Sequence, residues 1–241
     1  MQGPPMRYTT KRAPLVGQRP SRQVNLKSSS VCTGIFMSSK MRAGIAYESP
    51  IERDCLLLMD VLEGVAAFES QPLRLSFHLE GRVRSTFPDF LVTLRTGHQE
   101  LWECKPDDRM PADREAAIRA AARELGLPYR VVTPRWLRRQ PILANAARLR
   151  RHAGQPVIPQ HVLQAAMSGS NVAADLVSRS GCGMDAVLAS AMSGAIAINL
   201  ASHGFPQDAE IRPTRPGAHS GGVVMTSSAN APRGLRIPLT P

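Results

Sequence analysis

The pattern of apolar and polar positions predicts several short strands between residues 65 and 133. Within residues 86–105, the run 90–94 is rich in residues that favour strands, and residues 95–99 supply a turn. Residues 100–105 then alternate polar with apolar side chains, as a half-buried strand does. A β-hairpin is therefore expected here, with Trp102 and Cys104 facing the core.

The strongest helix signal lies directly before these strands, at residues 47–64. Ser49 is placed as the N-cap, Pro50 suits the first helical position, and Glu52 completes a capping box. Gly64 is placed as the end of the helix. One face of this helix collects apolar side chains, namely Ile51, Cys55, Leu58 and Leu62.

The elements around the hairpin follow the order helix, three or four strands, helix, strand. Strands are expected at 65–69, 73–79 and 83–86, and a strong helix at 112–125 is followed by a strand at 129–133. This order is similar to the core of restriction-endonuclease-like folds. The expected class is therefore α/β, with a mixed sheet flanked by helices.

A basic helical pattern follows at residues 134–152. Such a helix could lie along a phosphate backbone, or it could be a solvated helix that links two domains. The two interpretations remain open at this stage. Its basic residues are Arg135, Arg138, Arg139, Arg148, Arg150 and Arg151.

After a linker at residues 154–156, the composition shifts to small and apolar residues. Helices are expected at 159–167, 171–180 and 184–193, and Gly181 separates the last two as in a helix-turn-helix. Segments 195–200 and 209–212 could form a wing hairpin. A small winged-helix-like domain is expected over 157–212. Its expected recognition helix has no Arg or Lys, which favours protein contact or a structural role over groove binding.

The net charge of +11, from 30 basic and 19 acidic residues, is concentrated near the start of the chain. Residues 1–46 contain eight Lys or Arg and no acidic residue, and are expected to form a flexible arm. Such an arm suits a polyanion, most plausibly nucleic acid, although it could be a solvated tail. Residues 213–241 are rich in Pro, Gly and Ser, and a flexible tail is expected there.

The four cysteines are widely spaced, and they indicate neither a zinc site nor a disulfide framework. No apolar run approaches the length of a membrane span. We therefore expect a reducing, cytoplasmic location without a membrane, with nucleoid association when the protein is active.

The expected hairpin places Asp89 near Glu103 and Lys105, which share one face of their strand. Two carboxylates and an ammonium group on one face suit a divalent cation and a polarised water or phosphate. Alternatively, Asp89 could be a turn residue and the other two could be a solvated edge pair.

The residues Pro88, Asp89, Glu103 and Lys105 match the PD-(D/E)xK nuclease motif. Further segments resemble TnsA-type transposase endonucleases and together span about residues 47–106. They are the ES-x-x-ERD start of the catalytic helix at 48–54, the F-x-x-QP-L segment at 68–73, the PDFLV segment at 88–92 and the E-x-KP segment at 103–106.

The resemblance implies a subunit of a heteromeric cut-and-paste transposase. By this resemblance Glu52, Asp89 and Glu103 would hold one or two Mg²⁺ (or Mn²⁺) ions. Lys105 would orient the attacking water or stabilise the phosphorane. Gln71 could support the site from behind or could be only a turn residue, and Glu52 could serve the helix cap instead of the metal.

The implied partners are double-stranded DNA at transposon ends, a DDE-type transposase that cuts the other strand, and an AAA+ regulator that docks on the C-terminal region. The expected function is cleavage of donor DNA at the 5′ ends of a transposon by an endonuclease domain at 47–153. The alternatives are a catalytically idle adaptor that bridges DNA and proteins, and a restriction or repair nuclease of the same fold.

Overall fold

The computed structural model describes residues 33–106, 110–138, 141–168, 171–214 and 223–224. The expected tail beyond residue 214, apart from residues 223–224, lies outside these ranges, as do Arg139 and the expected arm up to residue 32. Among the described helices, none is long and apolar enough to cross a bilayer.

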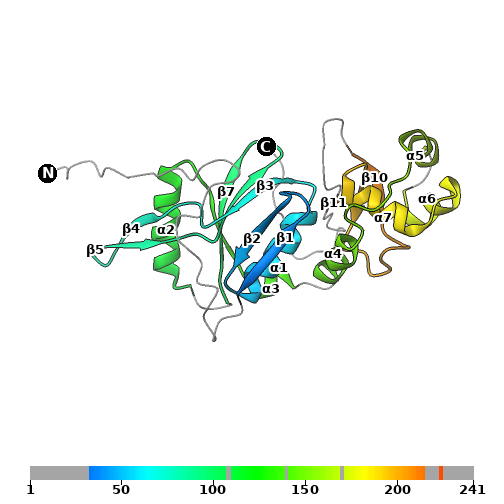
Figure 1. Ribbon diagram of the computed structural model, residues 1–241. Coiled ribbons are helices and arrows are strands. Elements are labelled where there is room, and N and C mark those ends of the chain that lie inside the picture. The colour runs from blue at the N-terminus through cyan, green and yellow to red at the C-terminus, as the bar shows by residue number, and fades with distance from the viewer. Residues whose placement is uncertain (1–32, 107–109, 139–140, 169–170, 215–222, 225–241) are drawn as a thin grey trace.

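A four-stranded mixed sheet forms the centre of the first domain (Figure 1). The order of the strands is β3-β6-β7-β8, antiparallel across the first three and parallel between β7 and β8. The parallel pair requires a crossover, which contains helix α2. The bounds are β3 (Val65–Ser70), β6 (Phe90–Leu94), β7 (Gln99–Cys104), α2 (Ala112–Glu124) and β8 (Tyr129–Val132). This mixed sheet flanked by helices confirms the expected fold class.

Two apolar cores lie on opposite faces of this sheet. On one face, Trp102 packs in the core that contains α1 (Pro50–Val61), and on the other, Leu101 packs in the core that contains α2. Both side chains are 1% exposed or less. The prediction of a half-buried strand at 100–105 was therefore wrong, because helices cover both faces of β7.

Helix α1 begins as expected, with Ser49 as its N-cap and Pro50 in its first turn. It ends at Val61 rather than at Gly64, because Leu62 adopts an extended conformation. Its last carbonyl groups bond to an ammonium group that lies far away in sequence. Lys40 Nζ donates to the carbonyl oxygens of Met59, Leu62 and Val65 at 2.7, 2.6 and 2.8 Å.

Residues 34–47 form a β-hairpin, although the sequence predicted a flexible arm up to residue 46. Strands β1 (Gly34–Ser38) and β2 (Ala43–Tyr47) pair antiparallel. The carboxylate of buried Asp60 on α1 accepts hydrogen bonds from Ser38 Oγ at 2.6 Å and Lys40 N at 3.0 Å. These long-range bonds hold the turn, and short-range sequence patterns do not reveal them.

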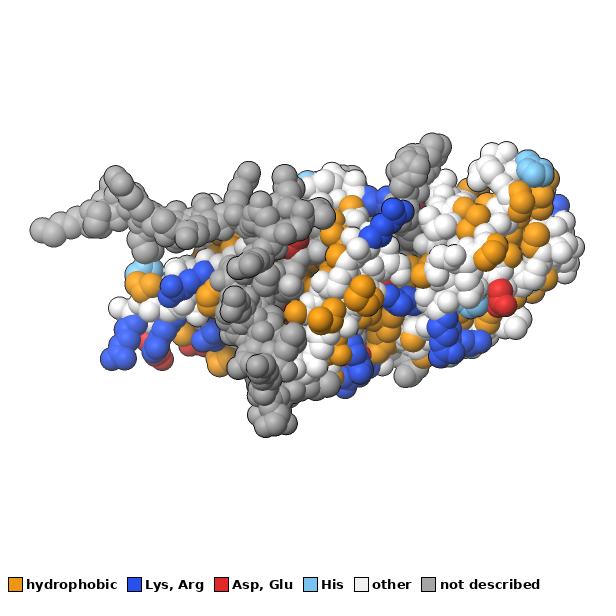
Figure 2. Space-filling model, viewed as in Figure 1, with side chains coloured by type: hydrophobic (Ala, Val, Ile, Leu, Met, Phe, Trp, Pro, Cys, Tyr) orange, Lys and Arg blue, Asp and Glu red, His pale blue; other side chains and the backbone are white. Residues whose placement is uncertain are grey.

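Apolar side chains gather on the outer face of this hairpin (Figure 2). Ile35 is 58% exposed and Met37 is 63% exposed. Alternation in β1 turns these two side chains outward while Phe36 packs against the core.

The basic segment after β8 forms two helices instead of the expected single one, namely α3 (Pro134–Leu137) and α4 (Ile142–Arg150). Three of its arginines bind other elements. Arg138 Nε lies 2.9 Å from Asp54 Oδ2, Arg150 Nε lies 3.0 Å from Asp60 Oδ2, and Arg148 donates to the carbonyl oxygen of Phe205 at 2.7 Å. These contacts favour the connecting role for the segment, since they join α1 to the C-terminal region.

The C-terminal region has three helices at about the expected positions and a small sheet. Strands β9 and β10 pair antiparallel, as predicted, while β11 pairs with β9 in parallel and was not predicted. Residues 187–192 of the last helix are buried, so this helix has a structural role. The bounds are α5 (Gln160–Met167), α6 (Ala173–Ser180), α7 (Met184–Ser193), β9 (Ile196–Asn199), β10 (Ile211–Pro213) and β11 (Val223–Val224).

Candidate nuclease site

Asp89 lies directly before β6, where backbone groups hold both its side chain and its main chain. Its Oδ2 accepts a 2.6 Å hydrogen bond from the backbone N–H of Cys104, at the end of β7. Its carbonyl oxygen accepts a 2.8 Å bond from the backbone N–H of Gln71. The register that pairs Phe90 with Trp102 extends to bring Asp89 beside the end of β7, as the expected hairpin requires.

Glu103 lies on β7 with its side chain on the α2 side of the sheet, and it is 1% exposed. Lys105 Nζ lies 2.8 Å from Glu103 Oε1, and the hydroxyl of Tyr129 donates a 2.6 Å bond to Glu103 Oε2. The alternative of a solvated edge pair is therefore wrong, since β7 is an internal strand and this carboxylate is buried.

Glu52 is held by the start of α1. Its Oε2 accepts a 2.7 Å bond from the backbone N–H of Glu48, and the hydroxyl of Ser49 donates to its Oε1 at 2.8 Å. Ser49 Oγ in turn accepts a 3.2 Å bond from the backbone N–H of Glu52. The cap therefore differs from the expected box, in which Glu52 would bond the amide of Ser49.

Gln71 follows β3 and is 7% exposed. Its φ of 45° lies in the left-handed region, which is uncommon for a residue other than glycine. Since its backbone bonds the carbonyl of Asp89, the structure places it beside the site. Whether it supports the chemistry stays a prediction.

The electrostatics show that Glu52, Asp89 and Lys105 act on one another. Burial, followed by the charge of Glu52, raises the pKa of Asp89 to about 8. Burial also raises the pKa of Glu52. Burial opposes the charge of Lys105, but the contact with Glu103 outweighs it and raises the pKa of Lys105. A concentration of carboxylates that resist ionisation is a feature of functional sites.

The donor types at this site fit a hard divalent cation, because carboxylate oxygens are the ligands that Mg²⁺ and Mn²⁺ prefer. In the present conformation, however, the described residues contain no group of three potential ligands that could hold an ion. In this conformation both oxygens of the Glu52 carboxylate accept hydrogen bonds at the helix cap, and both oxygens of Glu103 are bonded by Lys105 and Tyr129.

Tyr129 was missed as a site residue, because the sequence indicated only a strand at its position. Burial, together with the charge of Glu103, raises the pKa of the Tyr129 hydroxyl, so this group stays protonated and remains a donor. Only the parallel pairing of β7 with β8, which aligns Leu101 with Tyr129, brings the hydroxyl to Glu103.

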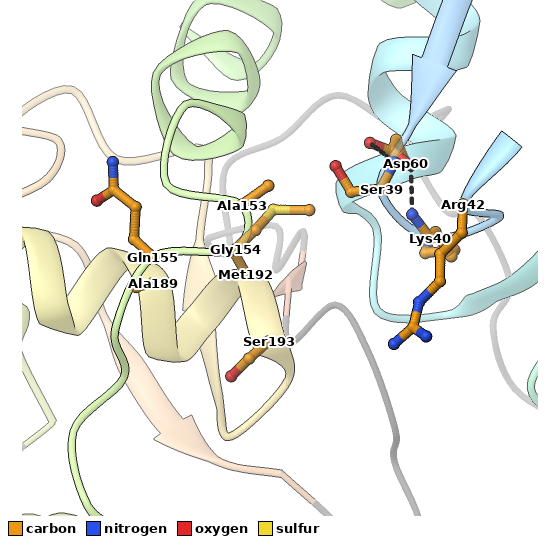
Figure 3. Close-up of a pocket in the computed structure, with 10 residues that line it drawn as sticks. All are labelled: Ser39, Lys40, Arg42, Asp60, Ala153, Gly154, Gln155, Ala189, Met192 and Ser193. Atoms are coloured by element: carbon orange, nitrogen blue, oxygen red, sulfur yellow. Dashed lines mark hydrogen bonds between the residues drawn. The ribbon is translucent and has the colours of Figure 1, made fainter. Parts of the chain in front are cut away.

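A separate cavity of about 800 Å³ lies between the β1–β2 turn, the end of α1 and helix α7 (Figure 3). Lys40, Arg42 and Asp60 line one side, and Gln155 and Ser193 line the other. The cavity contains none of the predicted site residues. Two of its three charged residues, Lys40 and Asp60, are committed to the bonds that hold the hairpin turn and the end of α1.

Comparison with known families supports a nuclease. Residues 63–134 match the model of a family described as TnsA-like endonuclease N terminal. The matched segment contains Gln71, Asp89, Glu103, Lys105 and Tyr129, and it begins after Glu52. A search of curated proteins found no match to this chain.

Proposed function

Because residues 63–134 match a TnsA-like endonuclease family, we propose that the chain is a metal-dependent DNA endonuclease of a transposase complex. In this role it would cut donor DNA at the 5′ ends of a transposon. The observation that carries the proposal is the meeting of Asp89, Glu103 and Lys105 at the ends of two paired strands, with Glu52 within electrostatic reach.

Glu52, Asp89 and Glu103 are the residues that would hold one or two Mg²⁺ or Mn²⁺ ions. A divalent cation lowers the pKa of a bound water and neutralises charge at a scissile phosphate. The raised pKa of Asp89 supports this assignment, since a cation would relieve the repulsion between neighbouring carboxylates.

The remaining groups of the chain orient these carboxylates. The backbone N–H of Cys104 fixes one oxygen of Asp89, and Tyr129 and Lys105 each bond one oxygen of Glu103. Lys105 keeps its charge because of Glu103. Its ammonium group can therefore orient the attacking water or stabilise the phosphorane.

The partners proposed for this activity are double-stranded DNA at the transposon ends, a DDE-type transposase and an AAA+ regulator. The transposase would cut and join the other strand. The regulator would dock on the C-terminal region. Gln71 is proposed to support Asp89 through the backbone bond between them.

One observation favours the alternative of a catalytically idle adaptor, namely the commitment of Glu52 to the helix cap. An adaptor would use the same fold to bridge DNA, transposase and regulator without cutting. The presence of all four polar residues of the proposed site, namely Glu52, Asp89, Glu103 and Lys105, favours the enzyme.

The deciding experiment is an end-cleavage assay with the purified partner transposase, Mg²⁺ and transposon-end DNA. Asp89→Ala should abolish 5′-strand nicking while cutting of the 3′ strand persists. Asp175→Ala, at an exposed position on α6, is the matched control and should nick normally. Survival of 5′ nicking in Asp89→Ala would contradict the site, and absence of nicking by the unsubstituted chain would favour the adaptor.

A further inference from the structure

A further β-hairpin projects from the nuclease domain (Figure 1), and its second strand ends at Thr86, shortly before Asp89. It consists of β4 (Leu75–Leu79) and β5 (Arg82–Thr86), joined by a tight turn at Glu80 and Gly81. Both turn residues have positive φ, of 52° and 70°, which is the geometry of a two-residue hairpin turn. The open end of the hairpin therefore lies next to the candidate site, and its tip lies away from it.

Helix α2 anchors this hairpin through β4. The side chains of Leu75 and Phe77 are 2% and 3% exposed and pack in the α2 core. The guanidinium of Arg114 on α2 lies over the ring of Phe77, 5.4 Å from its centroid. The hairpin is thus attached along one strand, while β5 remains accessible.

Arginines lie on one face of the hairpin itself, and Arg74, which directly precedes β4, lies on the other side. Arg82 and Arg84 pair with Leu79 and Phe77, so their side chains lie on the same face as the residues that pack against α2. On that face α2 contacts mainly strand β4, which leaves the two arginines of β5 exposed. Arg74 belongs to the opposite face and bonds Ser85 Oγ at 3.1 Å. The three arginines are exposed, and none of them forms an ion pair with a carboxylate of the described residues.

Few acidic or apolar groups interrupt this basic surface. Glu80 is the one acidic residue within 74–86. Val83 is 64% exposed on the same face as His78, its cross-strand partner. Figure 2 shows Lys and Arg side chains gathered at the end of the molecule where Figure 1 places this hairpin.

We propose that the β4–β5 hairpin enters the major groove of the DNA beside the scissile phosphate, with arginines contacting phosphates on both walls. This inference rests on the nuclease function proposed above. Five strand residues extend about 17 Å at roughly 3.4 Å per residue. A major groove about 12 Å wide admits a two-stranded ribbon.

The distribution of charge is what favours a groove over a flat contact. A ribbon lying on a surface presents one face, whereas a ribbon in a groove faces a phosphate backbone on either side. Arg82 and Arg84 would meet one wall and Arg74 the other. Phosphate contacts position a protein without reading sequence, so the hairpin would hold the duplex over Asp89 irrespective of the bases.

Salt dependence of binding provides the test, because each phosphate contact contributes about 0.9 to the slope of log K against log salt concentration. The full-length chain is titrated with a fluorescent 30-base-pair duplex in EDTA, so that no cleavage occurs. The double variant Arg82→Ala with Arg84→Ala should lower the slope by about 1.8, and Arg74→Ala by about 0.9. Arg179→Ala, at an exposed position on α6, is the control and should leave the slope unchanged.

Several outcomes would overturn the inference. They are an unchanged slope in the double variant, no effect of Arg74→Ala, and an equal fall in Arg179→Ala. A photoreactive p-benzoylphenylalanine at Val83 gives an independent measurement and should crosslink to the duplex. Absence of a crosslink to the duplex under conditions in which the duplex is bound would contradict the proposal.

The binding result and the cleavage result can fail separately. If the unsubstituted chain nicks transposon ends but the slopes do not change, the nuclease function stands and the role of the hairpin is wrong. If the slopes change as expected but no nicking occurs, the hairpin binds DNA in a protein that does not cut.

Discussion

The hydroxyl of Tyr129 donates a 2.6 Å hydrogen bond to Oε2 of Glu103, a carboxylate that is 1% exposed. The bond joins two parallel strands on the side of the sheet that α2 covers. A buried carboxylate oxygen loses water on folding, so this donor is needed to offset the desolvation.

Removing that donor should destabilise the protein. Tyr129→Phe leaves Glu103 Oε2 buried without its partner and should lower the free energy of unfolding by about 1–3 kcal/mol. The measurement is urea denaturation in EDTA. Tyr47→Phe is the control, since the Tyr47 hydroxyl makes no hydrogen bond within the described residues, and a comparable loss in both variants would contradict the assignment.

The two roles of Glu52, in the cap and in the site, can be separated with a pair of variants. Ser49→Ala removes the N-cap acceptor and should cost about 1 kcal/mol of stability while nicking persists. Glu52→Gln preserves the shape of the side chain and part of the cap but removes a charge. It should abolish nicking with a smaller loss of stability. Normal nicking by Glu52→Gln would assign the residue to the cap alone.

The metal-free protein should lose stability as the pH rises toward 8. The folded pKa of Asp89 is about 8, above the ordinary value of 3.8, so the folded state binds more protons than the unfolded state between these two pH values. The stability contributed by protonated Asp89 is complete at low pH and is lost as the pH rises and Asp89 ionises. Thermal melts in EDTA from pH 5 to 9 should show this decline in the unsubstituted chain and a weaker decline in Asp89→Asn. Identical pH profiles would rule out Asp89 as the source.

Metal binding should release a proton, because the raised pKa keeps Asp89 protonated in the metal-free protein below pH 8. Below pH 8 an ion that requires ionised Asp89 displaces its proton, so apparent affinity should rise with pH. Titration calorimetry with Mn²⁺ in buffers of different ionisation enthalpy measures the protons released. Asp89→Asn should bind weakly and release none, whereas binding of Mn²⁺ by this variant with unchanged affinity would place the ion elsewhere.

Lys40 should matter for stability although it lies outside the candidate site. Its ammonium group bonds three carbonyl oxygens at the end of α1 and the start of β3. Lys40→Met removes all three bonds and should lower the free energy of unfolding, since a hydrogen bond contributes about 0.5–1.5 kcal/mol. Arg42→Met is the matched control because Arg42 is exposed, and chemical denaturation should show little change for it. Equal losses for both variants would argue against the capping role.

The sequence by itself determined the elements whose signals are local. Ser49 and Pro50 set the start of α1, because an N-cap and the first turn depend on neighbouring residues. The apolar run at 90–94 became β6 with its predicted bounds. The short connection between β6 and β7 allowed Asp89 to be placed near Glu103 and Lys105 from spacing alone.

Tertiary structure decided what depends on distant parts of the chain. The hairpin at 34–47 requires Asp60, and the burial of β7 on both faces requires α1 and α2. Tyr129 reaches Glu103 only because a helical crossover returns the chain as a parallel strand. The helix cap can hold Glu52 because its hydrogen-bond donors, Glu48 and Ser49, are neighbours in sequence. A role of Glu52 as a metal ligand depends instead on Asp89 and Glu103, which the tertiary structure brings from separate strands.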